Sequence, residues 1–422
     1  MCTIAGLERG LMDLVDRLRA DSTELQPEMA RLRHRLHQRP EIGLHLPETQ
    51  QAVLEALDGL ALEISVGESC TSVTAVLRGT GADGDPAPAI LLRGDMDALP
   101  VQEEADVDYR STIDGAMHAC GHDLHTAMLA GAARVLSAHR DALRGDVVFM
   151  FQPGEEGLDG AGHMIREGVL DAAGPRVQRA YGIHVMSGDL PRHQFTTRPG
   201  TLMAASDWLS VTIIGAGGHG SAPHRAQDPV SVAAGLVTSL HAMVTRQFDV
   251  FDPVVLTVGS FHAGTRRNII PAEATFDATV RSFSPQAREK VREASIRMCQ
   301  EFAAAHGLRA EVRYRQEYPV TVNDPGQAEF ATAAVTDLYG ADRFTPMPTP
   351  EAGAEDFSRV LEQVPGCYLF LGACPHDDPE SAADNHSALA VFDDSVLADG
   401  CLLHASLAVR SLQAITASAT PG

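Results

Sequence analysis

The sequence lacks the patterns that mark several common classes of protein. Its seven cysteines are odd in number and form no CxxC pair, so a chain of 422 residues is not expected to rest on a disulfide framework. Acidic residues outnumber basic ones by 56 to 33, and the net charge of −23 argues against nucleic acid or an anionic membrane as a partner. No apolar run approaches ~18 residues, and "MCTIAGLERGLMDL" has no basic segment before an apolar one, as a secretory signal has. We therefore expect a cytoplasmic protein without a membrane span.

The length and hydrophobic content of the chain are those of a large globular protein. The chain is 44% hydrophobic, and its length suggests two domains. Strands alternate with helices up to about residue 198, which predicts an α/β domain with a mostly parallel sheet. Residues 199–316 instead read as two long helices and four strands, which predicts a smaller α+β domain of two helices on a four-stranded sheet. We expect this unit to be inserted into a catalytic domain made of residues 1–198 and 317–422.

Side chains that ligate metals follow several of the predicted strands. The carboxyl ends of parallel strands meet at one edge of a sheet, so these groups are expected to converge there. Imidazole, thiolate and carboxylate are the ligand types that hold zinc or manganese. The groups are Asp95 and Asp97 in "RGDMD", Cys120 and His122 in "MHACGHDLHT", Glu155 and Glu156 in "QPGEEG", His184 in "GIHV" and His386 in "DNHS".

Each cluster alone also has an ordinary structural explanation. Paired aspartates are common in turns, adjacent glutamates in solvated loops, and a lone histidine in a hydrogen-bonded core. Cys120 alone is most often an inert buried thiol, and a redox role is disfavoured because no cysteine lies near it in the sequence. The conjunction at successive strand ends favours a metal site over these alternatives.

The motifs also carry a family resemblance. "MHACGHDLHTAMLAGAA", "FQPGEEG", "GIHV", "GAGGHGSAPH", "NIIPAEATFDATVRSF", "AEDFS" and "NHS" occur in this order. Together they resemble the amidohydrolase branch of the metal-dependent aminoacylase/carboxypeptidase family, which includes hippurate hydrolases, N-acyl-amino-acid deacylases and auxin-conjugate hydrolases. The likeness runs from "LHQRPEIGLHLPET" to "NHSALAVFDDSVL". Ala388 stands where relatives commonly have proline, and Ala354 where many have serine, but neither departure removes a ligand.

The resemblance implies a site with two divalent ions, zinc or manganese. Glu155 would act as the general base, taking a proton from a bridging water. Asp95, and with less support Asp97, would orient a ligand. His118, Asp123 and His125 would be supporting or packing groups. The implied ligands are Cys120, His122, Glu156, His184 and His386.

The inserted domain would be the family's lid and dimerisation domain. In relatives the position of His219 reaches an active site, often that of the partner subunit, where it would stabilise the oxyanion of the tetrahedral intermediate. His224 is a lesser candidate. Asn268 and Arg281 match positions that contact the substrate's amide and carboxylate, and a planar guanidinium suits a carboxylate. The resemblance therefore implies a homodimer.

The expected activity is hydrolysis of the amide bond of N-acyl amino acids, which are small-molecule substrates. A dipeptidase or carboxypeptidase of the same fold is the alternative within the class, and no sequence feature separates the two. A non-catalytic metal-binding homologue is the alternative from another class, but it predicts loss of Glu155 or of a ligand, and each of these is present.

Overall fold

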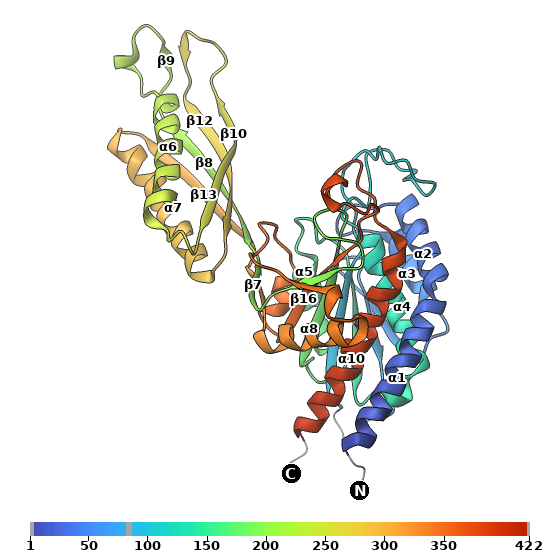
Figure 1. Cartoon of the computed structure of the whole chain (residues 1–422). Coiled ribbons are helices and arrows are strands. Elements are labelled where there is room, and N and C mark those ends of the chain that lie inside the picture. The colour runs from blue at the N-terminus through green and yellow to red at the C-terminus, as the bar shows by residue number, and fades with distance from the viewer. Residues whose placement is uncertain (1–3, 82–86, 420–422) are drawn as a thin grey trace. The chain divides into compact units, whose positions relative to one another are not determined.

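The structure, a computed structural model, describes residues 4–81 and 87–419 (Figure 1). The chain divides into two compact units. The first comprises residues up to Gly200 together with 323–348 and 359–422, and the second comprises 201–322 and 349–358. The sequence predicts 199–316 for the inserted unit, so the structure extends it at its end and adds a short later segment.

The first unit contains an eight-stranded sheet in the order β1-β2-β4-β3-β5-β16-β6-β15. Its centre, from β4 through β3 and β5 to β16, is parallel, and antiparallel pairs join β1, β2 and β6 to it. This confirms the predicted α/β class with a mostly parallel sheet. The strands are β1 (Leu62–Val66), β2 (Val73–Leu77), β3 (Ala89–Asp95), β4 (Asp146–Gln152), β5 (Arg179–Met186), β6 (Phe195–Thr197), β15 (Phe344–Pro346) and β16 (Gly366–Gly372).

Helices cover this sheet in layers. Helices α4 and α10 contact β3 and β5, α8 contacts β16 and β6, and α1, α2 and α3 pack on the outside of α4 (Figure 1). Because β3, β4 and β16 are buried along their whole length, they are continuous apolar runs rather than alternating ones. The helices are α1 (Ile4–Glu24), α2 (Gln26–Gln38), α3 (Pro47–Ala56), α4 (His122–Ala138), α5 (Gly160–Arg166), α8 (Pro325–Tyr339), α9 (Ser358–Leu361) and α10 (Leu397–Ala419).

The start of α4 is fixed by a glycine that no other residue can replace without a shift. Gly121 lies just before the helix at φ +80°, in the left-handed region. A Cβ there would come within 2.4 Å of Val185 Cγ2 on β5. The turn that carries Cys120 and His122 therefore packs directly against the strand that carries His184.

The second unit has a four-stranded antiparallel sheet in the order β10-β12-β8-β13. Helices α6 and α7 pack on one face of it and form a separate apolar core. Asp228 caps α6 and Ser284 caps α7, each followed by proline at the first helical position. The elements are β8 (Ala205–Ile214), β9 (Gly218–His219), α6 (Pro229–Gln247), β10 (Val254–Ala263), β11 (Ile269–Ile270), β12 (Glu273–Ser282), α7 (Pro285–Ala305) and β13 (Arg309–Tyr318); β7 (Gly200–Met203) and β14 (Thr321–Asn323) lie at the unit boundaries.

The described cysteines are all free and buried, and Cys2 lies outside the described residues. No helix in the described part of the chain is long and apolar enough to cross a membrane.

Candidate metal centre

Five of the residues expected to bind metal come together at the carboxyl edge of the parallel strands. Cys120 Sγ lies 3.4 Å from His184 Nε2 and 3.2 Å from His386 Nε2. The latter nitrogen lies 3.3 Å from Glu156 Oε1. Ligand atoms within 4.8 Å of one another form two triads, Cys120–His122–His184 and Cys120–Glu156–His386. The two triads share the thiol.

These spacings fit a divalent ion in each triad. Nitrogen and sulfur ligands at tetrahedral positions roughly 2.0–2.3 Å from a metal lie roughly 3.3–3.8 Å apart. Two buried ligand atoms have only ion-pair contacts: His122 Nε2 lies 3.5 Å from Asp95 Oδ2, and Glu156 Oε1 lies 3.3 Å from His386 Nε2. Buried polar atoms are rarely left without a close partner, and a cation would satisfy both atoms.

Backbone carbonyls orient the two buried imidazoles. His122 Nδ1 donates to Asp97 O at 2.8 Å, and His184 Nδ1 donates to Val185 O at 2.8 Å. Because Nδ1 keeps its proton in this hydrogen bond, each ring can bind a metal through Nε2 when the metal displaces the other proton.

Asp97 also holds the glutamate pair. Its two carboxylate oxygens accept from the backbone N–H groups of Glu155 at 3.0 Å and Glu156 at 3.1 Å. It therefore contacts both the segment of a proposed base and the segments of two proposed ligands. The sequence ranks Asp97 below Asp95, whereas in the structure both aspartates contact segments that carry proposed ligands.

Asp95 lies beside the imidazoles of the site, and its Oδ2 is 3.5 Å from His122 Nε2. It accepts from Arg93 at 2.7 Å and from His125 Nδ1 at 2.5 Å, and His125 Nε2 in turn accepts from Val185 N at 2.8 Å. Burial disfavours the charged carboxylate, but the charges of Arg93, His122 and His125 outweigh it and hold the pKa of Asp95 well below its usual range. Sequence reasoning missed Arg93, although a charged residue inside the apolar run "AILLRGD" is a signal for it.

The thiol of Cys120 differs from other buried thiols of the chain. Burial opposes its ionisation, but the charges of His184 and His122 bring its pKa well below the usual value. Burial instead raises the pKa of Cys299, Cys367 and Cys401 to about 12. Cys120 is thus the thiol suited to bind metal as a thiolate.

His386, an exposed residue and a proposed ligand, lies beside the negative groups Cys120 and Glu156. Hydrogen bonds with Cys120 and Glu156 raise the pKa of His386 to about 10. Burial, together with the negative Cys120, raises the pKa of Glu156 despite its contact with His386. A site that favours a proton on His386 also favours a metal cation in its place.

The other ionisable residues of "MHACGHDLHT", which are His118, Asp123 and His125, make contacts outside the two triads. Asp123 accepts from Arg33 Nε at 2.8 Å and from His37 Nδ1 at 2.8 Å. His118 is buried, burial lowers its pKa to about 3, and neither ring nitrogen has a hydrogen-bond partner among the described residues. Neither belongs to a metal triad, whereas His125 supports β5 as described above.

The candidate residues of the second unit lie at two ends of its sheet. His219 on β9 is exposed and pairs with Ile269 on β11, next to Asn268. His224, in the exposed turn Pro223–Arg225, lies five residues further along the chain. Arg281 instead pairs with Ser206 at the other end of β8. The structure thus brings Asn268 to His219 but not to Arg281.

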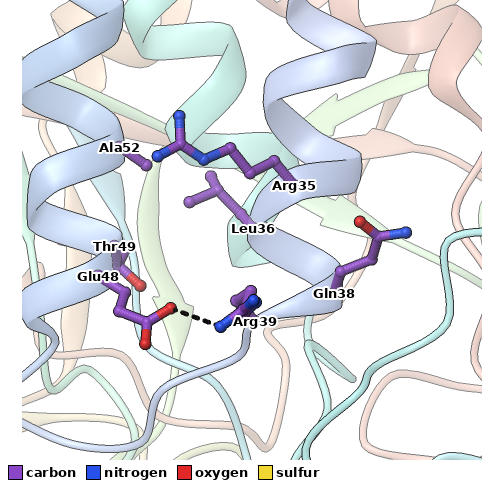
Figure 2. A pocket seen from close by; sticks show the side chains of 7 residues that line it. All are labelled: Arg35, Leu36, Gln38, Arg39, Glu48, Thr49 and Ala52. Atoms are coloured by element: carbon purple, nitrogen blue, oxygen red, sulfur yellow. Dashed lines mark hydrogen bonds and ion pairs between the residues drawn. The ribbon is translucent and has the colours of Figure 1, made fainter.

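A pocket of about 360 Å³ between α2 and α3 is unrelated to these residues (Figure 2). Its two arginines are already paired, Arg35 with Glu55 at 2.6 Å and Arg39 with Glu48 at 3.3 Å. No expected ligand lines it, so it is not the centre described above.

Comparison with known proteins identifies the family of the chain. The family model for peptidase family M20/M25/M40 matches residues 91–410. The chain is 36% identical to thermostable carboxypeptidase 2 of Saccharolobus solfataricus, over 94% of this chain and 99% of that protein. It is also 36% identical to IAA-amino acid hydrolase ILR1-like 2 of Arabidopsis thaliana, over 93% of this chain and 87% of that protein.

Among solved structures, a Bacillus subtilis protein described as a dinuclear metal-binding peptidase of the M20 family superposes with a TM-score of 0.78. It is 30% identical, and the match covers 93% of this chain and 99% of that one. Sequence, fold and the clustered ligand atoms lead to one conclusion: the chain belongs to peptidase family M20/M25/M40 and is a metal-dependent hydrolase.

Proposed function

We propose that the protein is a dinuclear amidohydrolase that releases the acyl group from N-acyl amino acids. One observation carries this proposal: two ligand triads share Cys120, and a ring nitrogen of His122 lies within 4.8 Å of carboxylate oxygens of both Glu155 and Glu156. Cys120, His122 and His184 would hold one ion, zinc or manganese, and Cys120, Glu156 and His386 the other. Bound there, the two ions would acidify a water and polarise the scissile carbonyl.

Glu155 supplies the proton transfers. Its side chain is only 6% exposed, and its backbone N–H is held by Asp97. It takes a proton from the attacking water and later gives it to the nitrogen of the leaving amine. In this proposal Glu156 serves as a ligand and the adjacent Glu155 as the base.

His219 suits the oxyanion that forms on the carbonyl oxygen. Its Nδ1 accepts from Ser221 N at 3.2 Å, so the proton of the neutral ring is on Nε2, which can donate. Asn268 lies beside it, since Gly220 N donates to Asn268 O at 2.9 Å. His219 and Asn268 would therefore act together, with His224 as a lesser candidate.

Arg281 would bind the substrate carboxylate. Burial lowers its pKa, its guanidinium donates to the Ser206 hydroxyl, and it forms no ion pair with a described residue. On β12, Glu273 pairs with Ile214 and Arg281 with Ser206, a separation of roughly 27 Å along an extended strand. His219 lies beyond the Ile214 end, so one small substrate cannot span both ends of one chain. We infer a homodimer through the inserted domain, in which His219 and Asn268 of the partner subunit complete each site.

A carboxypeptidase or dipeptidase remains the alternative, because two relatives are named as carboxypeptidases. The test is a hydrolysis screen after reconstitution with zinc or manganese, using N-acetyl, N-benzoyl and long-chain N-acyl amino acids against dipeptides with a free amino group. We expect turnover of the acylated compounds. Hydrolysis of dipeptides alone would overturn the proposal. A cytoplasmic location, expected from the sequence, stays a prediction.

Glu155→Gln tests the base. The variant should retain its metal and lose about 10²–10⁴-fold in kcat. Turnover at the wild-type rate with a full metal complement would show that another group removes the proton.

A further inference from the structure

The carboxamide of Asn385 joins chain segments that carry proposed metal ligands. Its Oδ1 accepts from the backbone N–H of Ser187 at 2.8 Å. Its Nδ2 donates to Val185 O at 3.0 Å and, more distantly, to Cys120 O at 3.4 Å. One side chain thus spans the end of β5 and the turn before α4.

Its contact with β5 bears on His184. Val185 O, which accepts from Asn385 Nδ2, is the same carbonyl that accepts from His184 Nδ1. Oδ1 accepts from the backbone N–H of Ser187, two residues further along. The carboxamide is therefore hydrogen-bonded to the strand end on both sides of Met186. Asn385 therefore fixes the carbonyl that directs Nε2 of His184 toward the site.

Asn385 also lies next to the thiol of Cys120 and precedes His386 in the chain. Nδ2 lies 3.8 Å from Cys120 Sγ as well as near the carbonyl of that residue. His386, the next residue in the chain, has φ +71°, a left-handed conformation uncommon for a residue other than glycine. Its backbone N–H donates to Ala119 O at 2.8 Å. A strained residue persists where surrounding contacts fix it, and here the hydrogen bond to Ala119 O does so, next to the anchored side chain of the preceding Asn385.

We propose that Asn385 is a positioning residue that sets the affinity of both metal positions, because it orients Cys120, which both share, together with His184 and His386. This rests on the proposed dinuclear site. Partners of this kind typically change metal affinity by about 10–100-fold when removed. Asn385 touches no substrate in this role.

Asn385→Asp tests the role with little change of shape. The carboxylate keeps an acceptor for Ser187 N but turns a second oxygen toward Val185 O and the Cys120 thiol. Titration with zinc against a competing chelator should show both ions bound about 10–100-fold more weakly than in wild type. In the cobalt-substituted protein, the thiolate-to-metal charge-transfer band should weaken or shift.

Asn323→Asp is the matched control. Asn323 is buried, whereas Asn385 is half-buried; like Asn385 it bridges separate segments, donating from Nδ2 to Thr197 Oγ1 at 2.9 Å and to Tyr368 O at 3.1 Å and accepting from Tyr368 N at 2.8 Å. It contacts no proposed ligand. It should lower the melting temperature and leave zinc affinity and the cobalt spectrum unchanged.

Wild-type zinc affinity in Asn385→Asp, or an equal loss in Asn323→Asp, would overturn the proposal. If Asn385→Asp does not fold, Ser187→Ala replaces it, because the Ser187 hydroxyl also donates to Asn385 Oδ1 at 2.9 Å. It should give a smaller loss of affinity, and unchanged affinity contradicts the role. Failure of the proposed function would appear separately, as wild-type protein that binds no pair of ions or hydrolyses no N-acyl amino acid.

Discussion

Replacing Asp97 by alanine should disable the site without removing a ligand. The carboxylate accepts from Glu155 N at 3.0 Å and Glu156 N at 3.1 Å, and it is 1% exposed. Hydrogen bonds to a charged group contribute about 1.5–3 kcal/mol each, so two of them represent about 3–6 kcal/mol of local positioning energy. The His122 contact is made by the backbone carbonyl of residue 97 and survives the substitution.

The loss should appear mainly as a slower chemical step. If the Glu155 carboxylate moves by about 1 Å, a loss of about 10²-fold in kcat follows. The assay is kcat and KM for an N-acyl amino acid at excess metal, with the metal content of each preparation measured in parallel. Asp97→Ala should fold, bind metal and turn over at about 1% of the wild-type rate.

Asp146→Ala is the control for this variant. Asp146 is also a buried aspartate, and it accepts from Gly79 N at 3.1 Å and Arg78 at 2.7 Å, but it begins β4, at the end opposite the glutamates. It should destabilise the fold without lowering kcat. If Asp97→Ala retains wild-type kcat, or if Asp146→Ala loses as much kcat as Asp97→Ala, the claim that Asp97 positions Glu155 is refuted.

Three further predictions concern stability, pH and assembly. Asp123→Asn should lower the free energy of unfolding by about 3–5 kcal/mol, because it removes the fully buried carboxylate that pairs with Arg33 and leaves only the partly exposed Asp394, 3.2 Å away; denaturant unfolding measures this, and a change below about 1 kcal/mol would contradict it. Zinc affinity should rise with pH up to the pKa of about 10 of metal-free His386, by about tenfold per pH unit for each proton displaced; calorimetry at several pH values tests this, and a flat profile would contradict it. Glu155→Gln and His219→Ala should each be inactive alone. In a mixed dimer one site combines the intact Glu155 of one chain with the intact His219 of the other, so mixing the two variants should restore activity; no recovery on mixing would contradict a site completed by the partner subunit.

The fold was predictable from the sequence where local patterns are strong. The apolar strands "AILLRGD" and "VVFMF" and the capped helices after Asp228 and Ser284 lie where periodicity and capping residues predict them. Strand β1 was not predicted, because this edge strand is exposed along most of its length and carries no clear alternation. Strand β16 is a short apolar run of a kind that periodicity alone does not assign.

The site was predictable only in part, because its contacts join distant segments. Cys120 and His386 are 266 positions apart in the chain and 3.2 Å apart in space. Because the carboxyl ends of parallel strands meet at one edge of a sheet, the sequence places such groups together there, and the family resemblance supplies the ligand set. Neither reveals that Asp97 holds both glutamates or that Asn385 joins three segments, because these hydrogen bonds depend on the exact path of loops. The roles of the individual residues stay predictions.

Metal stoichiometry of two single variants tests the central claim most directly. Because Cys120 belongs to both triads and His184 to one, wild-type protein should bind two ions per chain, His184→Ala one, and Cys120→Ala neither with comparable affinity. The measurement is metal content by elemental analysis after equilibrium dialysis against limiting zinc. Two ions retained by Cys120→Ala, or a single ion bound by wild type, would contradict a dinuclear centre built around the Cys120 thiolate.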